Sequence, residues 1–161
     1  MKAILLMLLV SLGCTSNEPK VAASGAPEKV APPIQSPRES DGASEPASLI
    51  RRYYEQIDSG DLRSAYALWA RGGQASGKSF DDFAAGFAET SEARVMVGDS
   101  IRIEGAAGSQ YAMIPVSVDA SLKSGESQHF EGTYTLRRSM VDGATPEQRT
   151  WRIESAELRK R

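Results

Sequence analysis

The sequence predicts an α+β fold between residues 48 and 161, with three helices packed on a curved sheet of four antiparallel strands. Apolar residues recur at helical spacing from Leu49 to Phe87, which is typical of helices with one buried face. From Val95 onward apolar and polar residues alternate, which indicates half-buried strands. Short turns separate the alternating segments, and connections this short join antiparallel strands.

The helical part divides into three helices at breaks that contain glycine. The apolar face of the first is formed by Leu49, Ile50, Tyr53, Tyr54 and Ile57. Ser59 and Gly60 end this helix, and Asp61 is a suitable N-cap for the second. The second helix is expected to bury Leu62, Ala65, Tyr66 and Trp69. Ser79 and Asp82 have capping-box spacing at the start of the third, whose apolar stripe consists of Phe80, Phe83, Ala84 and Phe87.

Four strands are expected after the helices. The first contains Val95, Val97, Ile101 and Ile103. In the second, the parity of the apolar residues changes around Ile114 and Pro115, which predicts a β-bulge that would bend the sheet. A hairpin turn at residues 123–126 leads into the third strand, and a polar loop at residues 142–148 leads into the last, from Thr150 to about Leu158.

Four local stretches give the domain a recognisable pattern: Ile50 to Tyr54, the break at Asp58 to Asp61, the helix Ala65 to Trp69, and the strand Trp151 to Ile153. With the order of elements, they resemble the NTF2-like or SnoaL-like superfamily over nearly the whole domain. The resemblance implies a cystatin-like cone, in which a curved sheet wraps round the helices and encloses a cavity. That superfamily includes isomerases, dehydratases, cyclases and noncatalytic binding modules, so the fold alone leaves the function open.

The first 13 residues have the layout of a signal peptide. Lys2 precedes the apolar run from Ala3 to Val10, which is too short to span a bilayer, since a spanning helix needs about 20 apolar residues. The stretch from Ser11 to Cys14 resembles the lipobox of bacterial lipoprotein precursors. The resemblance implies that residues 1–13 are removed and that Cys14 carries the lipid. Because Thr15 follows in place of the Asp that often retains such proteins at the inner membrane, it implies the periplasmic face of a Gram-negative outer membrane.

Residues 14–47 are expected to form a disordered linker between the lipid and the domain. The segment consists mainly of Ser, Ala, Pro, Glu, Lys and Gly, and its only large aliphatic residues are Val21, Val30 and Ile34. It cannot bury enough apolar surface to offset the entropy lost on ordering. The linker would therefore let the domain stand away from the membrane.

The overall composition excludes several classes of function. Nineteen basic and 21 acidic residues give a net charge of -2, so the chain has no strong field with which to attract nucleic acid. A single cysteine excludes an intrachain disulfide. His129 is the only histidine, and no metal-ligand spacing surrounds it, so we expect it to lie exposed on a strand and expect neither a metal nor another cofactor.

The run from Gly72 to Ser79 matches the phosphate-binding pattern G-x-x-x-x-G-K-S letter for letter. That motif works when a buried parallel strand leads into the glycine loop and a helix N-terminus follows it. Here residues 61–71 have helical periodicity, and the later strands are linked by hairpins. The sequence therefore predicts a loop between two helices, in which Ser79 caps the second, and no nucleotide hydrolysis.

Aromatic residues are the main candidates for a binding site, because rings with a polar tip both pack against a ligand and orient it. The candidates to line an internal pocket are Tyr53, Tyr54, Tyr66, Trp69, Phe87, Tyr111, Tyr134 and Trp151. Isomerase chemistry would also require a buried carboxylate with a raised pKa. Asp99, Asp119 and Glu131 are the strand-borne options, and nothing in the sequence selects among them.

Three functions stay open on the sequence. The first is a noncatalytic, lipid-anchored module that binds a small apolar molecule or a protein partner of the cell envelope. The second is an NTF2-like enzyme of isomerase or dehydratase type, which requires carboxylate or hydroxyl groups that converge inside the cone. The third, which the resemblance allows, is a homodimer formed through the sheet face with no small ligand.

Overall fold

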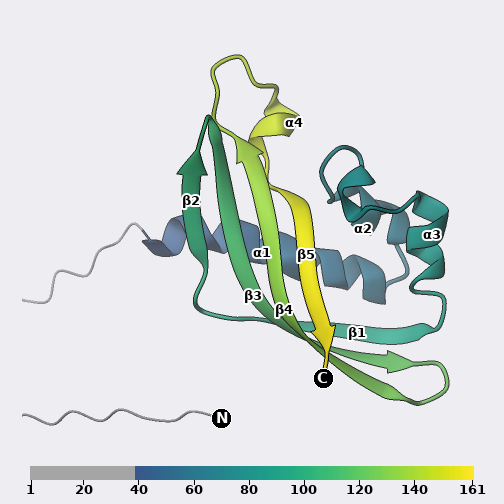
Figure 1. Ribbon diagram of the computed structural model, residues 1–161. Coiled ribbons are helices and arrows are strands. Elements are labelled where there is room, and N and C mark those ends of the chain that lie inside the picture. Colours follow the sequence, from purple (N-terminus) through teal and green to yellow (C-terminus); the bar gives the residue numbers. More distant parts are fainter. Residues whose placement is uncertain (1–38) are drawn as a thin grey trace, which may run out of the picture. The chain divides into compact units, whose positions relative to one another are not determined.

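The computed structural model describes residues 39–161, so the expected signal peptide, Cys14 and most of the expected linker lie outside the described residues (Figure 1). In chain order the elements are α1 (Glu39–Asp58), α2 (Leu62–Ala67), the 3-10 turn η1 (Gln74–Ser76), α3 (Phe80–Ala85), β1 (Thr90–Val97), β2 (Arg102–Ala106), β3 (Ser109–Leu122), β4 (Ser127–Ser139), α4 (Pro146–Arg149) and β5 (Arg152–Lys160). None of these helices has both the length and the apolar character that crossing a membrane requires.

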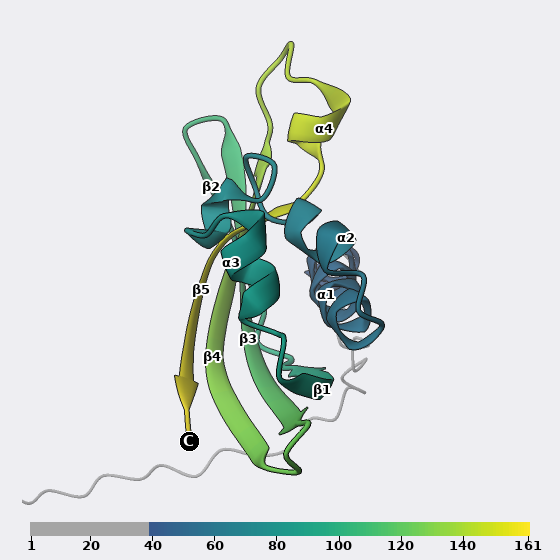
Figure 2. The ribbon, with the colours of Figure 1, turned by 90° about the vertical axis from the view of Figure 1, so that its right-hand side faces the viewer.

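The α+β class and the antiparallel sheet predicted from the sequence are confirmed. The strands pair in the order β1, β3, β4, β5, and β2 also pairs with β3. Figure 2 shows α1 and α2 on one side of the long, curved strands β3, β4 and β5. Both expected N-caps are present: the Asp61 carboxylate accepts from Ser64 N at 3.1 Å, and the Ser79 hydroxyl accepts from Asp82 N at 3.1 Å.

The described sheet has five strands, so the expected count of four was wrong. The single strand expected through Val95 and Ile103 is two strands, β1 and β2, which pair with successive parts of β3. The segment between them passes Pro115, whose carbonyl accepts from Gly98 N at 2.9 Å. Proline has no N–H to offer a neighbouring strand, so the neighbour leaves the ladder at this point.

The bulge expected at Ile114 and Pro115 is not in β3. The pairing of β3 with β4 runs without a shift from Ser109 with Ser139 to Ser121 with Ser127. The strand pairing is interrupted in the neighbouring strands instead. One interruption is the break between β1 and β2, and another is the register shift of β4 with β5 after Thr135. The apparent change of parity arose because Tyr111 and Met113 lie on the outer face, which is only half exposed.

Helix α1 begins at Glu39, nine residues before the expected start of the domain at Ser48. Pro46 lies inside the helix, and both Pro46 and Ala47 are buried. Tertiary packing therefore outweighs the usual cost of a proline within a helix. An ion pair of 3.2 Å between Glu45 and Arg138 also joins this first part of α1 to β4.

The core lies between α1 and the inner face of the sheet. Helix α1 contributes Ile50, Tyr53, Tyr54 and Ile57, all buried. The inner face of β3 contributes alternate residues, namely Ala112, Ile114, Val116 and Val118. Helices α2 and α3 have six residues each, and the turn η1 between them contacts β5. The unexpected helix α4 is held by a capping box between Thr145 and Gln148.

Candidate functional site

A partly open cavity of about 370 Å³ lies between the inner face of the sheet and the helices. Its wall combines aromatic rings with aliphatic side chains and a few polar groups. The lining residues are Tyr53, Tyr54, Trp69, Ser76, Lys78, Phe83, Gly86, Phe87, Thr90, Ala93, Val118, Ala120, Gln128, Phe130, Tyr134, Ala156 and Leu158. We call this cavity the aromatic pocket. Its size and composition are those of sites for small organic molecules.

Tyr53 of α1 lies at the centre of the aromatic wall. Its ring centroid is 5.2 Å from that of Tyr54, 6.1 Å from that of Trp69 and 6.0 Å from that of Tyr134, each in an edge-to-face arrangement. The Phe83 ring of α3 lies 6.5 Å away on another side. Edge-to-face packing places the positive edge of one ring against the negative face of the next, so these rings hold one another in position.

The tyrosine hydroxyls of the pocket are weak acids in an apolar setting. Those of Tyr54 and Tyr134 share a hydrogen bond of 2.8 Å, in which either oxygen can donate. Burial raises the pKa of Tyr54 to about 12, against a smaller opposing effect of the bond to Tyr134. Burial also holds the pKa values of Tyr53 and Tyr134 well above the ordinary value. All three hydroxyls therefore stay neutral, and they can hydrogen-bond to a ligand but cannot act as bases.

Five of the eight aromatic candidates line this pocket, namely Tyr53, Tyr54, Trp69, Phe87 and Tyr134. The other three lie elsewhere. Trp151 is buried under the guanidinium of Arg138, 4.6 Å from its ring. The Tyr111 ring lies on the outer face beside Arg137. Tyr66 packs against Phe83 outside the lining, and its hydroxyl donates to the Lys78 carbonyl at 2.8 Å.

Several lining residues were missed by the sequence interpretation. Phe83 was expected only as part of a helical stripe, and Phe130 only as the start of a strand. Lys78 was considered only as part of the phosphate-loop pattern. Phe130 could have been found from its parity with Tyr134, because residues two or four apart on a strand share a face. No local signal identifies Lys78.

None of the three candidate carboxylates lies in the aromatic pocket. Asp119 and Glu131 belong to the outer face of the sheet, and Asp99 is exposed in the segment between β1 and β2. No Asp or Glu is among the lining residues described above. The pocket therefore lacks the buried carboxylate that isomerase-type chemistry needs.

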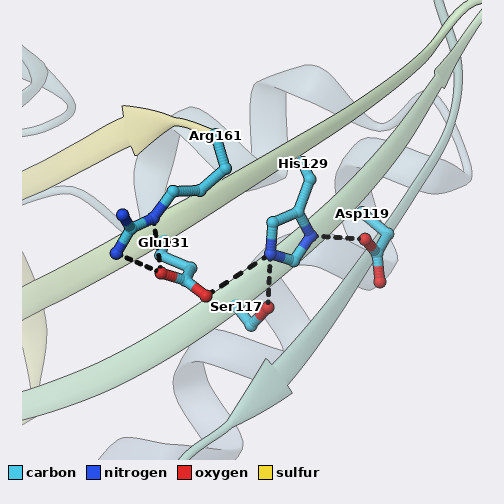
Figure 3. Close-up of polar contacts among 5 residues, drawn as sticks. All are labelled: Ser117, Asp119, His129, Glu131 and Arg161. Atoms are coloured by element: carbon cyan, nitrogen blue, oxygen red, sulfur yellow. Dashed lines mark hydrogen bonds and ion pairs between the residues drawn. The ribbon is translucent and has the colours of Figure 1, made fainter.

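Figure 3 shows a polar network on the outer face of the sheet. His129 Nδ1 lies 2.7 Å from Asp119 Oδ1, and its Nε2 lies 3.4 Å from Ser117 Oγ and 3.6 Å from Glu131 Oε1. Arg161 donates to Glu131 Oε2 at 2.7 Å. The hydrogen bond to Asp119, with a smaller contribution from Glu131, raises the pKa of His129.

The order of Ser117, His129 and Asp119 imitates a serine hydrolase triad, but two features exclude that chemistry. Two carboxylates favour the charged imidazolium, whereas the triad histidine must be neutral to accept the serine proton. Ser117 also lies in the middle of β3, with Met96 and Glu131 as its neighbours in the ladders. The surrounding backbone N–H groups are committed to the sheet and cannot form an oxyanion hole.

A second cavity, of about 390 Å³, lies between α4 and the ends of β4 and β5. Its lining includes four arginines and two glutamates: Arg71 binds Glu154 at 2.7 Å, and Arg152 lies 3.8 Å from Glu147. The other two arginines are bonded to residues outside the lining, Arg137 to the Ser109 hydroxyl and Arg138 to Glu45. These pairs join neighbouring segments of the fold. The aromatic pocket is therefore the stronger candidate for a ligand site.

The Gly72 to Ser79 run forms a loop between α2 and α3, as the sequence predicted. Only a single parallel bridge, from Trp69 to Ile153, lies before it, and the helix that follows has six residues. Gly72, Gly73 and Gly77 adopt positive φ angles. At Gly73 a side chain would overlap the Tyr66 ring, which explains glycine at this position. Within residues 42–161, no three His, Cys, Asp or Glu side chains group into a metal site.

Solved structures resemble this domain at low sequence identity. A Streptomyces avermitilis protein, provisionally named as a dehydratase of the NTF2-like family, superposes with a TM-score of 0.52 at 14% identity, over 74% of this chain and 95% of that one. An NTF2-like superfamily protein of Salmonella enterica matches with a TM-score of 0.50 at 16% identity, over 74% and 91%. The domain has the NTF2-like fold.

The NTF2-like neighbours differ in what they are named for. A Novosphingobium aromaticivorans protein, provisionally named as an aromatic ring hydroxylase, has a TM-score of 0.54 at 12% identity, over 74% of this chain and 88% of that one. No family model and no curated protein matches the sequence. The shared fold therefore carries no single activity, and the function has to be argued from the pocket.

Proposed function

We propose that this chain is a lipid-anchored protein of the cell envelope whose NTF2-like domain binds a small, mainly apolar molecule in the aromatic pocket without transforming it. The observation that carries the proposal is the pocket wall, in which packed rings surround about 370 Å³ and no carboxylate is present. Such a wall removes apolar ligand surface from water and needs no rearrangement to do so.

Binding is favoured over catalysis by the protonation states of the pocket. General acid–base chemistry needs a group that changes its charge near the working pH. The raised pKa values of Tyr53, Tyr54 and Tyr134 keep these groups in their neutral form. Some structural neighbours are named as dehydratases, which keeps an enzyme as the alternative. The converging hydroxyls of Tyr54 and Tyr134 meet one requirement of that alternative, but the pocket lining contains no carboxylate to act as the base beside them.

The proposed anchor rests on the lipobox resemblance of residues 11–14. Helix α1 begins at Glu39, so the 25 residues from Cys14 to Arg38 separate the proposed lipid from the domain. Fully extended, they could reach about 85 Å. This extended length is shorter than that of the linker expected from the sequence, which ends at residue 47. It still allows the domain to work away from the membrane surface.

A neutral fluorescent probe, N-phenyl-1-naphthylamine, tests the pocket. Fluorescence titration of the purified protein should show saturable binding of one probe per domain. Ala156→Trp places a large ring in the pocket wall and should abolish binding. Ser155→Trp is the matched control, because Ser155 is the neighbouring, exposed residue outside the lining. Equal binding to both variants, or none to the unaltered protein, would contradict the proposal.

The domain could instead bind a protein partner or a second copy of the chain. Native mass spectrometry distinguishes such complexes from a complex with a small ligand. The proposal predicts a monomer mass that increases by one small molecule when the probe is added. A homodimer that takes up no probe would instead support an interaction through the sheet face.

A further inference from the structure

The aromatic pocket contains one charged side chain, that of Lys78. Resting on the proposed function, we propose that its ligand is an amphiphile: an apolar or aromatic body that fills the pocket, and one anionic head, such as a carboxylate or sulfonate, that pairs with the Lys78 amine at the mouth. This assigns a chemical class to the ligand and a role to a residue of the phosphate-loop pattern.

The Lys78 amine is free to take a partner. The described residues include three lysines, Lys78, Lys123 and Lys160. The amine of Lys123 donates to the Ala88 carbonyl, and that of Lys160 pairs with Glu126 at 3.3 Å. No hydrogen bond or ion pair joins the Lys78 amine to any described residue, although its backbone groups are bonded. An exposed cation beside an apolar cavity favours a ligand with a negative group at one end.

The loop fixes where Lys78 lies. Its carbonyl accepts the Tyr66 hydroxyl at 2.8 Å, and Ser79 directly after it caps α3. The amine lies over Gly86 of the pocket wall, 3.6 Å from the position that a Cβ would take there. The backbone of Lys78 is thus held in place before any ligand binds.

The indole nitrogen Nε1 of Trp69 is a buried donor in the same wall, and the Tyr53 hydroxyl beside it serves as its partner. The Lys78 amine is a donor of the lining without such a partner, so the pocket favours a ligand that brings acceptor oxygens. With no carboxylate in the wall, an anion meets no repulsion from the lining.

Two probes that share one ring system test the inference. N-phenyl-1-naphthylamine is neutral, whereas 8-anilinonaphthalene-1-sulfonate carries a sulfonate on the same body. Lys78→Gln should weaken sulfonate binding about tenfold, because an ion pair at a partly solvated pocket mouth contributes about that factor to the affinity. Binding of the neutral probe should stay unchanged. Lys78→Arg should restore most of the lost affinity. Titrations at low and high salt should show that only the sulfonate depends on ionic strength.

Arg51→Gln is the matched control, because it removes one positive charge from the exposed face of α1, outside the pocket lining. It should leave both affinities unchanged. An equal loss of sulfonate binding in the Lys78 and Arg51 variants would indicate a general charge effect and overturn the inference. So would a Lys78→Gln variant that binds both probes normally, although the proposed function would then stand. Failure of the neutral probe to bind the unaltered protein would instead refute the proposed function itself.

Discussion

At the scale of single residues, the Tyr54–Tyr134 hydrogen bond is the polar contact most deeply buried in the pocket wall. Replacing either tyrosine with Phe leaves the other hydroxyl buried without this partner. We expect each single variant to lower the free energy of unfolding by about 1–3 kcal/mol. Urea denaturation followed by circular dichroism would measure the change.

The double variant Tyr54→Phe/Tyr134→Phe provides the control for this pair. Because it removes both hydroxyls together, neither is left buried without the other, and it should cost less than the two single changes combined. Strictly additive losses would show that the two hydroxyls do not depend on each other.

His129 allows a clean titration, because it is the only histidine in the chain. Its pKa is raised, with the hydrogen bond to Asp119 as the main cause. In Asp119→Asn, NMR titration of the imidazole should show a pKa closer to the ordinary value of about 6.5. Glu131→Gln should lower it by less. A pKa that is the same in the unaltered protein and in Asp119→Asn would contradict the network in Figure 3.

The raised pKa of His129 also determines the direction in which the stability of the fold changes with pH. A histidine whose pKa is higher in the folded than in the unfolded state stabilises the fold while it is protonated. The contribution is fully present below about pH 6.5 and is lost as the pH rises through the raised folded value. The difference in unfolding free energy between the unaltered protein and Asp119→Asn should therefore shrink over that interval. Since the group is exposed, the effect should be small.

At the scale of elements, β5 passes very close to β4 at Gly132. A Cβ at this position would overlap the backbone carbonyl of Glu157. Neither backbone can yield without breaking the β4–β5 ladder, so Gly132→Ala should destabilise the fold by at least about 2 kcal/mol. The thermal unfolding midpoint would record the loss.

Gly105 of β2 is the matched strand glycine, because no atom lies within 4 Å of the position that a Cβ would take there. Gly105→Ala should change the unfolding free energy by no more than about 0.5 kcal/mol. Comparable destabilisation in both variants would mean that strand propensity, rather than close approach of two backbones, explains Gly132.

The start of α1 gives a prediction about domain limits. A chain that begins at Ser48 lacks the buried Pro46 and Ala47 and the Glu45–Arg138 ion pair. We expect it to be less stable, by about 2 kcal/mol, than a chain that begins at Glu39, because it exposes apolar surface of the core. Equal urea midpoints would place the functional boundary at Ser48, where the sequence interpretation put it.

At the scale of the whole molecule, the proposed lipid on Cys14 determines where the domain works. In a Gram-negative host, Cys14→Ser should move the protein from the membrane fraction to the soluble fraction. Ser16→Ala, two residues further on, should leave it with the membranes. Immunoblots of the separated fractions provide the measurement. Unchanged membrane retention of Cys14→Ser would refute lipid anchoring.

The sequence by itself determined the class of the fold and most of its elements. The helical spacing of apolar residues from Leu49 to Phe87 indicates which face of each helix is buried. The alternation of apolar and polar residues from Val95 onward does the same for the strands. The two N-caps, Asp61 and Ser79, were also predictable, because each acts on backbone groups only three residues away. The Gly72 to Ser79 run was predictable as a loop between two helices for the same local reason.

Only the tertiary structure decided which side chains meet. The hairpin places Asp119 opposite His129, and a shift of one residue in that turn would send the histidine to the inner face. Pro115 acts on the neighbouring strand rather than on its own, and burial keeps Pro46 inside a helix that its local sequence opposes. The aromatic pocket, and Lys78 at its mouth, arise from contacts between residues far apart in the chain. Such contacts leave no periodic signal in the sequence.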